Sequence, residues 1–202
     1  MASGFADNAL LATLLATTAP VLFCPAMNKD MYAHPAYQEN QKKLIDRGYR
    51  MVTPGQGALA CGEVGWGRLA DKADILDALK LILSAGQKLQ GRSVLITAGP
   101  TCEPLDPVRF LSNRSSGKMG YALAEAAALQ GARVTLVSGP TQLRPFATVN
   151  LIPVTTAQQM ADATLSRLEE HDIFIAAAAV SDYRPEQVQE QKIKKNDQAL
   201  TL

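Results

Sequence analysis

A segment of small residues near the middle of the chain could bind an anion. It reads Ser115-Ser116-Gly117-Lys118 and precedes an apolar stretch of helical periodicity. A helix starting here, predicted over residues 116–130, would present free backbone N–H groups, the positive end of its dipole and a lysine ammonium. These groups suit a phosphate or carboxylate, although the pattern also fits an ordinary helix capped by Ser115 or Ser116.

The preceding loop adds groups that could act with this helix start. Asp106, Pro107 and Arg109 are followed by Asn113. Proline restricts the backbone, and a guanidinium can hold an oxyanion with two hydrogen bonds. We therefore predict a rigid anion-recognition loop. The GxGxxG and GxxxxGK[ST] signatures are absent from the sequence, which disfavours a standard NAD site or P-loop.

Composition excludes several classes of protein. The 202 residues are 47% hydrophobic, enough for a packed core, and the formal net charge of +1 favours neither nucleic acid nor an anionic membrane as a partner. No apolar run is long enough to cross a bilayer, so we expect a cytoplasmic protein. Cys24, Cys61 and Cys102 are widely spaced, and the chain has only two histidines, which argues against a disulfide framework or a zinc site.

The second half of the chain predicts a parallel sheet, because apolar strand patterns are separated by helical ones. The expected strands are 93–98, 133–137, 149–154 and 172–178, and the expected helices are 116–130 and 157–170. Ligands of such sheets bind beyond the carboxyl ends of the strands.

The first half has a different organisation. We predict a packed helix near residues 9–16, short strands at 21–24 and 49–52, helices at 30–47 and 71–83, and a glycine-rich loop at 54–68. The predicted domains are 1–86 and 93–202, joined by a linker over 87–92. Because the chain begins within an apparent helix and ends after an uncovered strand, we expect both domains to be partial.

Several motifs together resemble one family of enzymes. They are ADNALLATLLA, PAMNKDMY, ACGEVGWGRLA, ITAGPTCEPLDPVRFLSNRSSGKMG, AAAAVSDYRP and KIKK. In this order they resemble the bifunctional phosphopantothenoylcysteine decarboxylase and phosphopantothenate–cysteine ligase of coenzyme A biosynthesis. The resemblance implies an α/β fold: the C-terminal part of a flavodoxin-like or Rossmann-like flavoprotein domain, then the N-terminal part of a second Rossmann-like domain.

For the decarboxylase half, the resemblance implies FMN as cofactor and 4'-phosphopantothenoylcysteine as substrate. Cys61 matches the proton donor on a flap that covers the substrate, and a thiol is mostly protonated at neutral pH. Asn28 matches a residue that binds the substrate carboxylate, and it could also cap the helix that follows. The family's catalytic histidine and main flavin motif match no position in this sequence.

For the ligase half, the resemblance implies that CTP activates 4'-phosphopantothenate as an acyl-cytidylate, which the amine of cysteine then attacks. Asn113 matches the residue acting on that intermediate, where its amide could polarise the carbonyl under attack. Lys192 matches a lysine placed against the phosphates, on a segment expected to be mobile until ligand binds. Ala177, Ala178 and Asp182 match nucleotide contacts. Mg²⁺ is implied by the chemistry of a nucleotide triphosphate rather than by any ligand cluster visible in the sequence.

The resemblance also implies a homo-oligomer for the whole enzyme and an inactive isolated fragment. Two alternatives stay open: a non-catalytic regulatory protein with a flavin-binding fold, and an NAD(P)-dependent reductase with a Rossmann-like sheet. The segment DPVRFLSNRSSGKMG argues against both.

Overall fold

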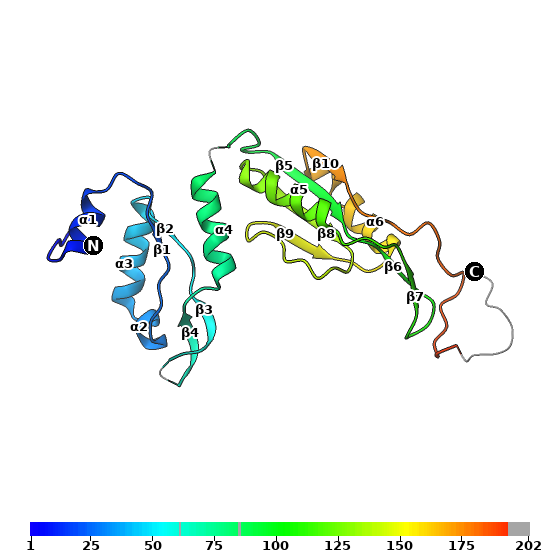
Figure 1. Cartoon of the computed structure of the whole chain (residues 1–202), viewed down its shortest axis with the longest axis horizontal. Coiled ribbons are helices and arrows are strands. Elements are labelled where there is room, and N and C mark those ends of the chain that lie inside the picture. Colours follow the sequence, from blue (N-terminus) through cyan, green and yellow to red (C-terminus); the bar gives the residue numbers. More distant parts are fainter. Residues whose placement is uncertain (61, 85, 194–202) are drawn as a thin grey trace. The chain divides into compact units, whose positions relative to one another are not determined.

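The computed structural model describes residues 1–60, 62–84 and 86–193. The chain divides into two compact units, Met1–Leu83 and Ser84–Leu202, which are described separately (Figure 1). The second unit contains both helices and strands, and its main sheet is parallel, so the predicted α/β class is confirmed. Among the described residues, no helix is both long and apolar enough to cross a bilayer.

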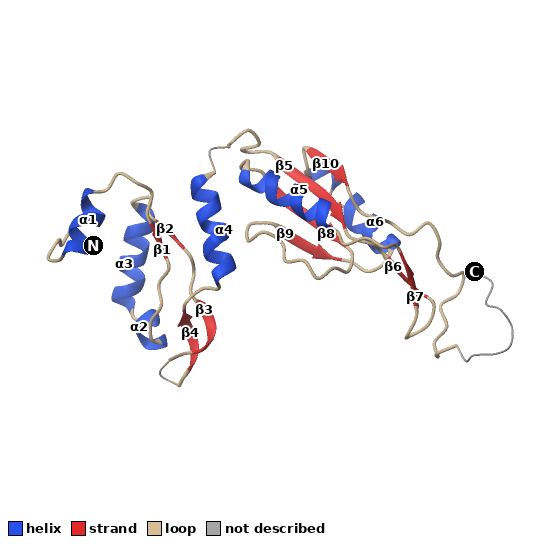
Figure 2. Ribbon diagram, in the orientation of Figure 1, coloured by secondary structure: helices blue, strands red, loops and turns tan. Residues whose placement is uncertain are grey.

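The first unit combines helices with short strand pairs (Figure 2). The helices are α1 (Ala9–Ala16), α2 (Lys29–Ala33), α3 (Pro35–Asp46) and α4 (Lys72–Leu83). The strands are β1 (Leu22–Phe23) and β2 (Arg50–Met51), which are parallel, and β3 (Gly55–Ala58) and β4 (Val64–Arg68), which are antiparallel. The helix α1 forms as predicted, but none of its residues is buried in the described structure.

The prediction of a single helix over residues 30–47 is wrong. The helix is divided at His34, which ends α2 and caps the start of α3, where its ring Nδ1 accepts a hydrogen bond from the N–H of Ala36 at 3.2 Å. Pro35 is the cause, because a residue that precedes proline is disfavoured in the helical conformation, whereas proline itself fits the first helical position.

The glycine-rich segment predicted as a loop instead contains the β3–β4 hairpin. Its glycines allow a close approach to the preceding chain. The N–H of Met27 donates to the carbonyl oxygen of Gly67 at 2.8 Å. Gly67 has a φ of +125°, and a Cβ there would lie 2.1 Å from the carbonyl oxygen of Met27. The glycine-rich composition therefore predicted a loop where strands form, because glycine in these strands permits close backbone packing.

The second unit is built on a parallel sheet with the strand order β10-β5-β8-β9. These strands are β5 (Ser93–Ala98), β8 (Arg133–Ser138), β9 (Asn150–Pro153) and β10 (Ile173–Ala176). The accompanying helices are α5 (Lys118–Leu129), α6 (Ala157–Leu165) and the 3-10 helix η1 (Leu168–Glu170), so the helix predicted over 157–170 ends earlier than expected.

Helices cover both faces of this sheet. Leu95 of β5 packs in a cluster with Met160 of α6, whereas Ala98 lies against Gly120 of α5. Residues 95 and 98 point to opposite faces because side chains alternate along a strand. Every residue of β5 is buried, including the polar Ser93 and Thr97, as is typical of a parallel strand covered on both faces.

A small hairpin interrupts the predicted loop between β5 and α5. β6 (Cys102–Pro104) pairs antiparallel with β7 (Phe110–Ser112), and residues 105–109 form the turn. We call this element the β6–β7 hairpin. Its strands are three residues long, too short for periodicity to reveal them in the sequence.

Candidate functional site

The strand order identifies where a ligand of this sheet would bind. The chain passes from β5 to β8 and β9 on one side, then returns to the other side of β5 as β10. Ligands of open α/β sheets bind at the carboxyl edge where the strand order reverses, and here that place is the ends of β5 and β10.

The segments leaving these two strands stay together beyond the sheet. Pro100 and Ala179 form a parallel bridge, and the N–H of Ala179 donates to the carbonyl oxygen of Gly99 at 2.9 Å. The N–H of Ser181 donates to the hydroxyl of Thr101 at 2.9 Å. These hydrogen bonds give the rim of the sheet at this place a defined backbone conformation.

Asn113 reaches this rim from the end of the β6–β7 hairpin. Its side-chain Nδ2 donates to the carbonyl oxygen of Val180 at 2.8 Å and to that of Ala179 at 3.3 Å. The neighbouring Ser112 donates its hydroxyl to the carbonyl oxygen of Thr101 at 2.7 Å. The structure thus places Asn113 against the segment 177–182, which contains three other predicted site residues.

Those three residues differ in exposure. Ala177 and Ala178 are half-buried just after β10, and the N–H of Ala177 donates to the carbonyl oxygen of Thr97 at 3.2 Å. Asp182 is exposed further along the same segment. Small side chains and an exposed carboxylate at a strand end could accommodate a ribose or a base.

The start of α5 differs from the capped helix that the sequence also allowed. Gly117, in the left-handed conformation with a φ of +73°, is the N-cap and makes no side-chain capping bond, so Ser115 and Ser116 do not cap α5. The hydroxyl of Ser115 instead accepts from the N–H of Gly117 at 3.3 Å. A Cβ at Gly117 would lie 3.2 Å from the Cα of Gly99, so the loop after β5 approaches α5 closely.

The loop predicted to recognise an anion instead makes contacts within the protein. Arg109 Nε lies 3.1 Å from Asp106 Oδ2, and the Arg109 guanidinium donates to the carbonyl oxygen of Ile193. Arg109 is therefore engaged within the protein, and the loop holds the chain that follows residue 188. Lys192, exposed, lies in that chain one residue before the contact.

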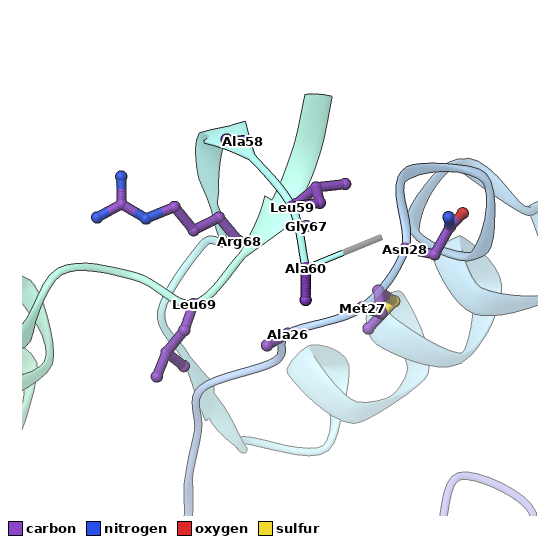
Figure 3. Close-up of a pocket in the computed structure, with 9 residues that line it drawn as sticks. All are labelled: Ala26, Met27, Asn28, Ala58, Leu59, Ala60, Gly67, Arg68 and Leu69. Carbon is purple, nitrogen blue, oxygen red and sulfur yellow. The ribbon is translucent and has the colours of Figure 1, made fainter. Parts of the chain in front are cut away.

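A separate cavity of about 450 Å³ lies in the first unit. It is lined by Ala26, Met27, Asn28, Ala58, Leu59, Ala60, Gly67, Arg68 and Leu69. Figure 3 shows Ala60 pointing toward Ala26 and Met27, with the Arg68 guanidinium directed away from them. The volume and the mostly apolar lining are typical of a small-molecule site.

Asn28 lies at the edge of this cavity and has two functions in its local structure. Its Oδ1 accepts from the N–H of Asp30 at 2.8 Å, so the predicted helix cap is confirmed for α2. Its Nδ2 donates to Glu63 Oε2 at 3.2 Å, while Lys29 Nζ lies 3.2 Å from Glu63 Oε1. Asn28 and Lys29 together hold a carboxylate from the β3–β4 hairpin.

Cys61 lies outside the described residues. Its described neighbours belong to the tip of the β3–β4 hairpin, where the N–H of Leu59 donates to the carbonyl oxygen of Glu63 at 2.8 Å. In the part of the chain that the structure describes, no group of three or more His, Cys, Asp or Glu side chains could hold a metal ion.

Comparison with protein families gives two adjacent matches. Residues 1–84 match the Flavoprotein family, and residues 89–202 match the DNA/pantothenate metabolism flavoprotein C-terminal domain. The second match covers more than half of the chain. The chain belongs to the DNA/pantothenate metabolism flavoprotein family. The order of the two matches is that of the two units.

Curated relatives in this family are similar over nearly the whole chain. The coenzyme A biosynthesis bifunctional protein CoaBC of Vibrio vulnificus (strain YJ016) is 49% identical over 197 residues, 98% of this chain and 49% of that protein. The CoaBC protein of Bacillus subtilis (strain 168) is 48% identical over 205 residues, 100% of this chain and 50% of that protein. The chain thus spans about half the length of these relatives.

A solved structure matches part of the chain. The crystal structure of the C-terminal domain of a CoaBC protein is 50% identical, has a TM-score of 0.50, and the match covers 54% of this chain and 58% of that one.

Sequence reasoning missed several residues around these sites. Glu63 was read only as part of a glycine-rich loop, although it binds Asn28 and Lys29. Glu103 is buried, and its Oε1 accepts from the N–H of Ala157 at the start of α6 at 2.8 Å. Each contact joins residues more than thirty positions apart, so no local pattern in the sequence could have revealed it.

Proposed function

We propose that the chain carries parts of two enzymatic sites of coenzyme A biosynthesis. The second unit would contribute to the CTP-dependent ligation of 4'-phosphopantothenate with cysteine. The first would contribute to the FMN-dependent decarboxylation of 4'-phosphopantothenoylcysteine. The similarity to CoaBC proteins along nearly the whole chain supports this assignment. The observation that carries the ligase part is the contact of Asn113 with Ala179 and Val180 beyond the carboxyl ends of β5 and β10.

The proposed ligation has two steps. The carboxylate of 4'-phosphopantothenate attacks the α-phosphorus of CTP, which forms the acyl-cytidylate and releases pyrophosphate. The amine of cysteine then attacks the acyl carbon, and CMP leaves with the electron pair of the broken acyl–phosphate bond. Lys192 would neutralise phosphate charge, while Asp182 and the backbone at Ala177 and Ala178 would contact the nucleotide. Mg²⁺ would arrive with CTP, since the described residues offer no metal cluster of their own.

The hydrogen bonds of Asn113 constrain its part in this reaction. Its Nδ2 already donates to the carbonyl oxygens of Ala179 and Val180, which uses both protons of the amide. In this arrangement Oδ1 is the atom able to meet an incoming ligand, and it accepts hydrogen bonds. We therefore assign Oδ1 to the N–H of the attacking cysteine amine. Polarising the acyl carbonyl, as the family resemblance implied, would require Asn113 to release one backbone contact.

For the decarboxylase part, we place the substrate carboxylate near Asn28. Asn28 and Lys29 already hold the carboxylate of Glu63, so their donors suit such a group. The neighbouring cavity would take the apolar part of the substrate. Bound FMN would supply the oxidation and reduction chemistry of this reaction. The described residues that line the cavity would contact the substrate. Cys61 would supply the final proton.

Substitution of Asn113 tests the assignment of the two sites. A chimera in which this chain replaces the matching segment of the Bacillus subtilis relative provides a complete enzyme. We expect Asn113→Ala to lower CTP- and cysteine-dependent product formation by about 10²–10³-fold, a loss typical when one polar group at a reacting centre is removed. Flavin-dependent release of carbon dioxide should stay unchanged.

Asn150→Ala is the matched control, because Asn150 is an exposed asparagine at the start of β9. It should leave both activities intact. Equal loss of both activities in a folded Asn113→Ala variant would overturn the assignment. A folded chimera that binds flavin and catalyses neither reaction would instead favour the non-catalytic regulatory role.

A further inference from the structure

The segment Gln189–Ile193, which we call the docked segment, is fastened to the turn of the β6–β7 hairpin. The N–H of Gln189 donates to the carbonyl oxygen of Leu105 at 3.0 Å. The N–H of Ile193 donates to Asp106 Oδ2 at 3.0 Å, and the Arg109 guanidinium donates to the carbonyl oxygen of Ile193. Both backbone polar groups of Ile193 are thereby held by one acid–base pair.

Asp106 connects the two parts of this contact. Asp106 is buried, with only 3% of its surface exposed to solvent. Oδ1 accepts from the N–H groups of Val108 and Arg109, each at 2.8 Å, and so shapes the turn. Oδ2 faces the Arg109 guanidinium and the N–H of Ile193. One carboxylate therefore sets the shape of the turn and holds a residue 87 positions further along the chain.

The ionised form of Asp106 is the one that this arrangement favours. Burial disfavours the charge, but the N–H groups of Ile193, Val108 and Arg109 and the Arg109 guanidinium outweigh it, so the pKa of Asp106 lies below its usual value. At neutral pH the carboxylate is charged, and hydrogen bonds to a charged acceptor are stronger than neutral ones.

The β6–β7 hairpin carries the two proposed ligase residues at separate points. Asn113 follows directly after β7, and Lys192 adjoins the Ile193 contact at the turn. From this connection we infer that Asp106 is a positioning residue, which orders the docked segment and thereby holds Lys192 in register with Asn113. The inference deepens the proposed ligase function, and the role of Lys192 rests on that function. The docking of the segment by Asp106 does not depend on it.

Asp106→Asn removes the charge and keeps the shape of the side chain. An amide has one oxygen acceptor, so it can serve the turn or Ile193 but not both. In this chain without ligand, we expect amide hydrogen exchange of residues 189–193 to become about tenfold faster or more, because a hydrogen bond to a charged group is lost. Glu186→Gln, which neutralises an exposed carboxylate close by in the sequence, should leave the exchange rate unchanged.

A second variant acts from the other side of the contact. Gln189→Pro removes the N–H that reaches Leu105 and leaves the β6–β7 hairpin unaltered. It should also accelerate exchange at residues 190–193. Unchanged exchange in a folded Asp106→Asn variant would overturn the docking role of Asp106, and faster exchange in Gln189→Pro would show that the measurement detects undocking.

The link to Lys192 is tested by a double-mutant cycle in the chimera. Asp106→Asn should weaken CTP binding about tenfold, and adding it to Lys192→Ala should cost little more than Lys192→Ala alone, because both changes act through one contact. Fully additive losses would show that Asp106 acts independently of Lys192. If the wild-type chimera bound no CTP, the proposed function would fail, and the exchange experiment would still decide whether Asp106 docks the segment.

Discussion

The side-chain amide of Asn113 donates to the backbone carbonyl oxygen of Val180 at 2.8 Å. This bond joins the β6–β7 hairpin to the segment after β10, two elements that are 67 positions apart in the sequence. It sets the orientation of the Asn113 side chain, which the sequence motifs alone could not show.

We expect Asn113→Asp to disrupt this junction. A carboxylate offers only acceptors, so its oxygens would face the carbonyl oxygens of Ala179 and Val180 without a proton between them. Because both hydrogen bonds are exposed, losing them costs about 0.5–1.5 kcal/mol. The thermal midpoint and amide exchange of residues 177–182 measure the effect, with Asn150→Asp as control. Exchange at 177–182 no faster than in the control would contradict the structural role of the amide.

Gly67→Ala should loosen the β3–β4 hairpin. The new Cβ would meet the carbonyl oxygen of Met27 at 2.1 Å, and the φ of +125° is unfavourable for alanine. Gly62→Ala is a matched control, since Gly62 also has a positive φ, +83°, but a Cβ there meets nothing within 4 Å. We expect Gly67→Ala to cost about 1–3 kcal/mol more than the control, through overpacking.

Trp66, the single tryptophan of the chain, lies beside Gly67 on β4 and reports this change. Denaturant unfolding followed by its fluorescence compares the two variants directly. Equal midpoints for the two alanine variants would mean that the hairpin does not approach Met27 this closely.

Gly120→Ala should destabilise the second unit, contrary to helix propensity. Within a helix, glycine to alanine normally gains about 1 kcal/mol. Here the added Cβ would lie 2.4 Å from the Cβ of Ala98 on buried β5, and overpacking of a core costs about 1–3 kcal/mol. We expect the cost of overpacking to exceed the gain in helix propensity. The thermal midpoint should fall for Gly120→Ala and recover in part when Ala98→Gly is added; a rise in the single variant would disprove the close packing.

Stability of the second unit should fall at acid pH through Asp172. Its Oδ2 accepts from the backbone N–H and the hydroxyl of Ser93, each at 2.7 Å. These bonds, helped by Arg92 and opposed by partial burial, lower the pKa of Asp172 to about 2 from 3.8. Because the folded pKa is the lower one, the contribution is present above pH 3.8 and is lost as pH falls toward 2.

Asp172→Asn tests this prediction. The variant should unfold at a lower temperature at pH 7 and lose less stability than the wild type between pH 5 and about 2.5. Asp162→Asn, an exposed aspartate on α6, serves as control. Parallel pH profiles for the wild type and Asp172→Asn would show that another group is responsible.

Cys61→Ser in the chimera should slow the decarboxylase reaction after carbon dioxide has left. A serine hydroxyl is a far weaker acid than a thiol, so protonation of the final intermediate should become limiting. Carbon dioxide release and product formation, measured in one assay, separate the two steps. Cys24→Ser is the control, and a normal rate of product formation in Cys61→Ser would exclude the acid role.

Much of the second unit follows from its sequence. The strand predicted over Ser93–Ala98 forms with these bounds and is buried along its whole length, because the apolar run Val94–Ile96 suits a parallel strand covered on both faces. The predicted strand ends at residues 98 and 137 lie within one residue of the observed ends of β5 and β8. Asn28 was correctly identified as a helix cap, since capping depends on residues only a few positions apart.

Only the tertiary structure decided how distant residues meet. The sequence identified Asp106 and Arg109 as a charged loop, but it could not show that their charges hold Ile193 rather than a ligand. It also read the glycines of β3 and β4 as a loop, because the reason for Gly67 is the backbone of Met27, forty residues earlier. Local periodicity determines which elements form, whereas contacts between distant segments determine which polar groups stay available for chemistry.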